Sequence, residues 1–197
     1  MIDGGLCFPL PLKEGVLVIM NKAAVLSELR QKTGSKTLQD REMWKAPQLE
    51  SGVARGIVAE LLGNARIDWL IDLFKMNPEQ LIFWCKSEAQ ANPVALKQRG
   101  VELERIKFVN SVGDLQQPLR MALESQLYPF IVAPNRFDEV RIFQRFHLLA
   151  EKSKSTLFLL GNKDFSQAWP ISLQLSIDNT EDGFDIYVNK QKHGVNE

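Results

Sequence analysis

The stretch GIVAELLGNARIDWLIDLF, residues 56–74, decides the fold of this chain because it combines two structural periods. Its first seven residues form an apolar run typical of a buried strand, and Gly63-Asn64 then marks a turn. Beyond the turn, apolar residues recur at the spacing of one helix face: Ile67, Leu70, Ile71 and Phe74. A strand, a tight turn and a helix in this order form the frame in which many proteins bind a nucleotide phosphate.

The turn itself lacks the groups that a phosphate loop uses. Such a loop needs glycine-rich backbone, a lysine for the outer phosphates and a Ser or Thr hydroxyl for magnesium. Here the turn GNAR, residues 63–66, has one glycine and no lysine, and Asp68 at the helix start repels an incoming phosphate. The later strand that would supply an acidic residue for magnesium ends in Pro134 and Asn135 instead. The sequence therefore predicts no nucleotide hydrolysis.

The composition limits the class of protein further. The chain has 197 residues, of which 45% are hydrophobic and 24% charged, which predicts one soluble globular domain with a short extension. The 24 basic and 24 acidic residues balance, so no global field draws the chain to nucleic acid or membrane. Cys7, Cys85, His147 and His193 are too few and too scattered for a metal centre or a catalytic constellation. We expect no metal, no cofactor, no catalytic residue and a reducing cytoplasm.

The rest of the chain repeats the strand-and-helix rhythm. Apolar runs predict strands at residues 56–62, 80–85, 105–110, 128–135 and 155–161. Amphipathic or capped stretches predict helices between them, at residues 65–74, 92–99, 114–123 and 138–150. This alternation predicts an α/β fold with a mainly parallel sheet and helices on both faces. The alternating segments 170–178 and 183–189 predict an antiparallel hairpin added to the sheet edge.

The segment before residue 56 divides into two parts. Residues 1–19 are expected to be a disordered or wrongly assigned start, because MNKAAVLSELRQKTG, from Met20, begins with a capped helix. Residues 20–55 are expected to form that N-terminal helix, at residues 21–32, and a polar connector anchored by Trp44. The predicted α/β domain then covers residues 56–197.

Several of these stretches resemble the RecA-like core, and within it the non-hydrolysing SulA/ImuA group. GIVAELLG resembles the opening strand of that group, and LIFWCKSE is similar to its next strand. ALKQRGVELERIKFVNS, ALESQLYPFIVAPN and FQRFHLLAEKSKSTLFLL resemble the helices and strands that follow, and FDIYVNKQKHG is similar to a late strand. The resemblance runs from Gly56 to Gly194 and lies in element order and apolar pattern. The Walker residues are absent, so the ATP-dependent activities of RecA do not carry over.

The resemblance implies a RecA-like three-layer α/β/α fold and a role in the SOS response to DNA damage. SulA-like chains stop soon after the LFLL strand, whereas this chain continues through the hairpin as ImuA-like chains do. An ImuA-like protein works with RecA, a catalytically inactive Y-family polymerase relative and a replicative polymerase in error-prone bypass of damage. It would be cytoplasmic and nucleoid-associated. Two alternatives stay open: a SulA-like division inhibitor that binds FtsZ, and a divergent nucleotide-binding RecA-like ATPase.

Six residues are candidates for contacts with protein partners or DNA. Arg141 and Arg145 lie one helical turn apart, opposite the predicted buried stripe; an ordinary charged helix face is the alternative. Trp69 lies just off the stripe of its helix, which makes it a candidate interface residue; packing in the core or at its edge is the alternative. The remaining three are expected to follow the last strand, where a solvated terminus is the alternative: Lys190, Lys192 and His193.

Overall fold

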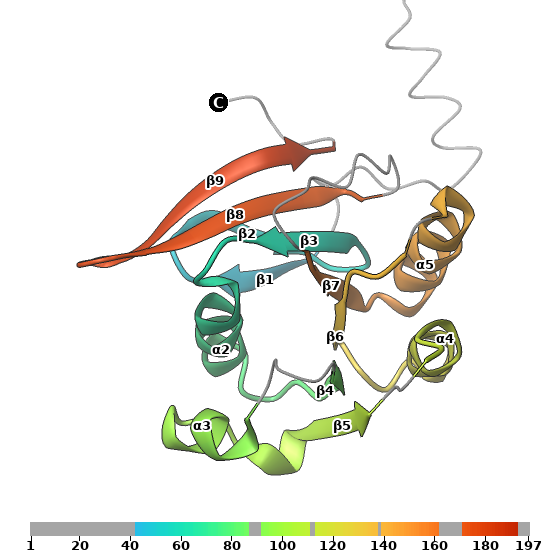
Figure 1. Ribbon diagram of the computed structural model, residues 1–197, viewed down its shortest axis with the longest axis horizontal. Coiled ribbons are helices and arrows are strands. Elements are labelled where there is room, and N and C mark those ends of the chain that lie inside the picture. Colours follow the sequence, from blue (N-terminus) through green and yellow to red (C-terminus); the bar gives the residue numbers. More distant parts are fainter. Residues whose placement is uncertain (1–41, 87–91, 111–112, 138, 162–170, 193–197) are drawn as a thin grey trace, which may run out of the picture. The chain divides into compact units, whose positions relative to one another are not determined.

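The computed structural model describes residues 42–86, 92–110, 113–137, 139–161 and 171–192 (Figure 1). All of them belong to one compact unit, Thr37–Glu197. The helix predicted at residues 21–32 and the start proposed at Met20 lie outside the described residues.

A seven-stranded sheet forms the centre of this unit and confirms the predicted α/β class. Its strands lie side by side in the order β5-β4-β6-β7-β3-β8-β9. Every neighbouring pair is parallel except β8 and β9, which form the predicted antiparallel hairpin at the edge. The bounds are β3 (Val58–Leu62), β4 (Ile82–Lys86), β5 (Ile106–Asn110), β6 (Phe130–Pro134), β7 (Thr156–Leu160), β8 (Leu173–Thr180) and β9 (Gly183–Gln191).

Helices cover both faces of the sheet, as the continuous apolar strands require. Helices α2 and α3 contribute to the apolar cluster on one face, and α4 and α5 contribute to the cluster on the other. Figure 1 shows α4 and α5 together on one side and α2 on the opposite side. The bounds are α2 (Arg66–Met76), α3 (Pro93–Gln98), α4 (Gln116–Ser125) and α5 (Val140–Ser153), with a short 3₁₀ turn at Leu103–Arg105.

Part of the expected polar connector is a β-hairpin. β1 (Met43–Ala46) and β2 (Leu49–Ala54) pair antiparallel as a separate two-stranded sheet. Alternate residues of β1 are buried, and a strand with this period can cover apolar surface while its other face meets water. The hairpin lies over α2, with which β1 is in contact.

Trp44 anchors the hairpin, as the sequence indicated. Its indole Nε1 donates a hydrogen bond to Oγ1 of Thr156 at 2.9 Å, and its ring centroid lies 4.7 Å from that of Phe130. The guanidinium of Arg55 lies 3.7 Å from the centre of the indole ring, a cation–π contact. Thr156 and Phe130 are the first residues of β7 and β6, so Trp44 ties the hairpin to the start of the central strands.

Candidate functional site: the turn after β3 and the α4–α5 surface

Strand β8 covers the turn after β3. Nucleotide-binding proteins that share this strand–turn–helix frame hold phosphate at such a turn. β3 ends at Leu62, which pairs with Ser176, while β8 continues to Thr180 and so runs past the turn. The amide of Ala65 donates to the carbonyl oxygen of Ile177 at 3.1 Å. The amide of Asn64 donates to Oδ1 of Asp178 at 3.2 Å. Two amides at the start of α2 are therefore bonded to the chain's own β8.

Gly63 makes this close approach of two backbones possible. Its φ of +88° lies in the region that glycine adopts readily, and a Cβ there would overlap the carbonyl oxygen of Ile177. Asn64 adds a further tie, because its Oδ1 accepts a hydrogen bond from the amide of Asn179 at 3.3 Å. The single glycine of the turn thus serves the contact with β8.

The charged groups around the turn are also held within the chain. Nη1 of Arg66 donates to the carbonyl oxygen of Gly63, and Asp68 forms an ion pair with Arg99, the residue after α3. The carboxylate of Asp178 lies at the N-terminal end of α2, where the helix dipole favours a negative charge. An internal carboxylate therefore occupies the position at which this frame would receive an anion.

A buried carboxylate that the sequence analysis missed lies beside this turn. Glu60 is in the middle of β3 and only 1% exposed. Its Oε1 accepts a hydrogen bond from Nδ2 of Asn135, and its Oε2 accepts one from Nε2 of Gln174 at 2.6 Å. A Cβ at Gly161 would lie 2.8 Å from Glu60 Oε1, so this glycine leaves room for the carboxylate. The available signal was one acidic residue inside the apolar run IVAELL.

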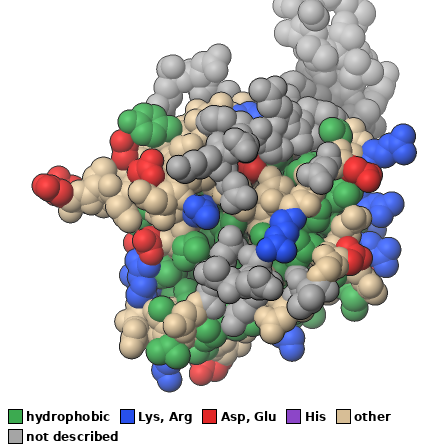
Figure 2. Space-filling model, viewed as in Figure 1, with side chains coloured by type: hydrophobic (Ala, Val, Ile, Leu, Met, Phe, Trp, Pro, Cys, Tyr) green, Lys and Arg blue, Asp and Glu red, His purple; other side chains and the backbone are tan. Residues whose placement is uncertain are grey.

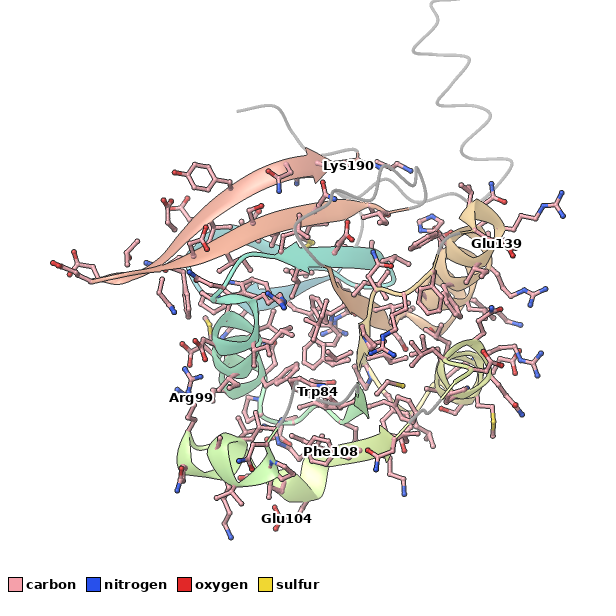
Figure 3. All side chains as sticks on the ribbon, in the orientation of Figure 1. Trp84, Arg99, Glu104, Phe108, Glu139 and Lys190 are labelled. Atoms are coloured by element: carbon pink, nitrogen blue, oxygen red, sulfur yellow. The ribbon has the colours of Figure 1, made fainter. Side chains whose placement is uncertain are left out.

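Lys190 extends these polar groups to the sheet edge. Glu60 is the register partner of Gln174, which in turn pairs with Lys190. Figure 3 labels Lys190 on β9. Burial lowers the pKa of the Lys190 amine, and the negative charge of Glu60 partly opposes that shift. We call Asn135, Glu60, Gln174 and Lys190 the Glu60 row. At the end of β6, where magnesium-dependent hydrolases have an acidic residue that binds the metal, this row has the amide of Asn135. Among the described residues, no group of three or more His, Cys, Asp or Glu could hold a metal ion.

The candidate residues at the C-terminal end differ from a free tail. Lys190 belongs to β9, and Lys192 donates its backbone amide to the carbonyl oxygen of Ser172 at 2.8 Å. Both side chains are half-buried, and burial lowers the pKa of both amines. The expectation that both lysines follow the last strand is therefore wrong for Lys190. His193 lies outside the described residues.

Trp69 is not an exposed interface residue. It is 0% exposed, and its Nε1 donates to the carbonyl oxygen of Pro47, in the β1–β2 turn, at 3.0 Å. Its ring meets Phe158 of β7 edge-on. The interface role is therefore wrong and the alternative, packing in the core, is confirmed: the hairpin covers a side of α2 that lies off the stripe given by the helical period.

Arg141 and Arg145 are exposed on α5, as predicted. Neither forms an ion pair with another described residue. Arg145 also lines a cleft of about 280 Å³ between the first halves of α4 and α5. Figure 2 shows Lys and Arg side chains along this side of the unit, with acidic side chains between them. The structure thus brings Arg145 together with α4, whereas the Glu60 row lies within the sheet.

The order of elements, the parallel sheet with helices on both faces and the terminal hairpin define a RecA-like α/β fold. A solved structure of the RadB recombinase is similar to this chain, with a TM-score of 0.50 and 13% sequence identity. The similarity covers 72% of this chain and 84% of the RadB chain, and at this identity it shows the fold alone. No protein-family model matches the chain, and no curated protein matches its sequence. None of the helices in the described part of the chain is long and apolar enough to cross a membrane.

Proposed function

We propose that this chain is a non-catalytic accessory protein of the DNA-damage response that works by binding other proteins. One observation carries the proposal: Ile177 and Asp178 of β8 use the amides of Ala65 and Asn64, at the turn where a RecA-like nucleotide site would lie. A phosphate would have to displace both hydrogen bonds and approach the Asp178 carboxylate. The RecA-like fold then serves as a scaffold for contacts with partners.

The proposed role is the ImuA-like one in error-prone translesion synthesis. The supporting features are the resemblance of the stretches between Gly56 and Gly194 and the hairpin that continues beyond β7. The proposed partners are RecA, an inactive Y-family polymerase relative and the replicative polymerase assembly, in the cytoplasm and on the nucleoid. The proposal includes no nucleotide and no metal, and it leaves direct DNA contact open.

Two measurements test this proposal at separate points. Isothermal titration of the purified chain with ATP and magnesium is expected to give no binding heat, and clear micromolar binding would overturn the non-catalytic assignment. Affinity purification from cells with damaged DNA is expected to recover RecA or the polymerase relative. Recovery of neither under saturating damage would contradict the ImuA-like role. Filamentation of cells that overproduce the chain, with normal DNA synthesis, would favour the SulA-like alternative instead.

A further inference from the structure

We infer that the cleft between α4 and α5 binds an acidic peptide segment of a partner protein, with an apolar side chain of that segment entering the cleft. The cleft is lined by residues of both helices and of the segment before α4: Asp114, Gln116, Gln117, Arg120, Ile142, Arg145 and Phe146. Its volume of about 280 Å³ lies just below the usual range of ligand pockets, which suits one or two side chains.

The floor of the cleft is apolar and held in place by aromatic contacts. Phe146 is 1% exposed, and its ring centroid lies 5.2 Å from that of Phe137, edge-on. Phe137 meets Phe143 in the same way at 5.9 Å. Ile142, half-buried, completes the apolar lining. A floor fixed by packed rings is preformed, so an entering side chain gains contact area with little reordering of the protein.

The rim of the cleft carries positive charge from both helices. Arg120 of α4 and Arg145 of α5 line it, and Arg141 lies one turn before Arg145 on the same helix. Nε of Arg120 is 3.6 Å from Glu124 Oε1, and both side chains are about half exposed, so this pair binds weakly. Asp114 is the acidic residue of the lining, and its Oδ1 accepts a hydrogen bond from the Gln116 amide at 2.7 Å. The lining thus carries two arginines and one carboxylate, a net charge of +1 that favours a carboxylate of the partner.

The surroundings of the cleft favour a peptide over a nucleic acid. Exposed acidic residues flank the arginines on both helices: Glu124, Glu151 and, at the start of α5, Glu139, which Figure 3 labels. A phosphate backbone requires a continuous basic surface, which these carboxylates interrupt. A short acidic segment can place one or two carboxylates on the guanidinium groups of Arg120 and Arg145 and leave the glutamates in water. The combination of an apolar floor and isolated arginines is typical of hot spots at protein interfaces.

This inference rests on the proposed function only in that the chain works by binding proteins. It concerns the chemistry of the docking surface, so it holds for a partner outside the damage response as well. Selection from a random peptide library tests peptide binding directly, without cells and without damaged DNA.

The test uses the full chain, immobilised, with a displayed library of random dodecapeptides. Peptides that combine Asp or Glu with Leu, Ile, Phe or Trp are expected to be enriched. The double variant Arg120→Glu and Arg145→Glu is expected to weaken binding of the selected peptides by about tenfold or more. The double variant Lys97→Glu and Lys107→Glu has the same change of net charge on other exposed positions, and we expect less than about a twofold effect. Ile142→Ala tests the floor and is expected to weaken binding by about threefold to tenfold.

Circular dichroism of each variant shows whether it has folded. The inference is overturned if no acidic apolar consensus is enriched, or if the selected peptides bind both double variants equally. It is also overturned if an oligothymidine strand binds more tightly than the peptides and depends on the same two arginines. In that case the cleft belongs to a nucleic-acid surface.

Discussion

The backbone of Ile177 lies so close to Gly63 that a Cβ at position 63 would be 2.8 Å from the Ile177 amide nitrogen and would overlap its carbonyl oxygen. β8 is thus fitted against the turn that follows β3. The contact uses the Ala65 amide at the start of α2, so it joins the edge hairpin to the first crossover of the sheet.

Replacement of Gly63 by alanine is expected to lower the free energy of unfolding by about 3 kcal/mol or more. Both the positive φ and the overlap with Ile177 oppose a side chain. Gly100→Ala is the matched control, because Gly100 has a φ of +85° with nothing within 4 Å of a Cβ. Its expected loss is only about 1–2 kcal/mol, the cost of the left-handed conformation. Urea unfolding followed by tryptophan fluorescence compares them, and equal losses would contradict the close contact.

Trp69→Phe is expected to destabilise the fold by about 2 kcal/mol, because the hydrogen bond to Pro47 is lost and the smaller ring leaves a void. Leu148→Ala, at an exposed position on α5, is expected to change stability by less than about 0.5 kcal/mol. Chemical denaturation measures both variants. A Trp69→Phe protein of unchanged stability that fails to bind its partners would restore the interface role for Trp69.

Glu60→Gln is expected to lower the free energy of unfolding by about 2 kcal/mol. The glutamine amide would face one of the two donors, Asn135 Nδ2 or Gln174 Nε2, and leave a buried polar group without its hydrogen bond. Glu79→Gln, on an exposed position, controls for the charge change and is expected to stay within about 0.5 kcal/mol of the parent protein. Thermal and urea unfolding measure both variants. Equal free energies of unfolding for the two would contradict a stabilising role for the Glu60 row.

The same Glu60→Gln variant is expected to lower the pKa of Lys190 further, because Glu60 is the charge that raises it against the effect of burial. NMR titration of the Lys190 side-chain carbons measures this shift directly. An unchanged or higher pKa would contradict the electrostatic coupling between the two side chains.

The lowered pKa of Lys190 also sets a sign for stability. The ordinary pKa of the Lys190 amine is 10.5, and its pKa in the folded chain is lower, so the unfolded chain binds this proton more firmly. The contribution of the amine to stability therefore rises with pH between the folded pKa and 10.5. Lys190→Met is expected to remove this rise. Unfolding curves at a series of alkaline pH values would show it as a difference between the two proteins.

Cys85 is expected to resist thiol reagents in the folded protein. It is buried in β4, and burial raises the pKa of its thiol to about 12, so thiolate is scarce at neutral pH. In a Cys7→Ser background, labelling by a disulfide reagent is expected only as fast as the protein unfolds, and urea should accelerate it. Rapid labelling in native buffer would show that β4 opens locally.

The sequence determined the elements and their class. Strand and helix periods located the central strands, helices α2 to α5 and the terminal hairpin of the described residues, because each period records burial along one element. The apolar run LIFWC is typical of a buried strand, and Cys85 at its end is buried. The alternation at the end of the chain predicted an antiparallel pair, and β8 and β9 form it.

Only the tertiary structure decided which elements meet. Trp69 is buried because a hairpin packs against α2, and no period within α2 records that neighbour. The carboxylate oxygens of Glu60 accept hydrogen bonds from Asn135 and Gln174, which are 75 and 114 residues away in sequence. The contact between Gly63 and Ile177 forms because β8 runs past the end of β3, and the register of the two strands sets that position. Local spacing fixes what each segment is, whereas contacts between distant segments come from packing of the whole sheet.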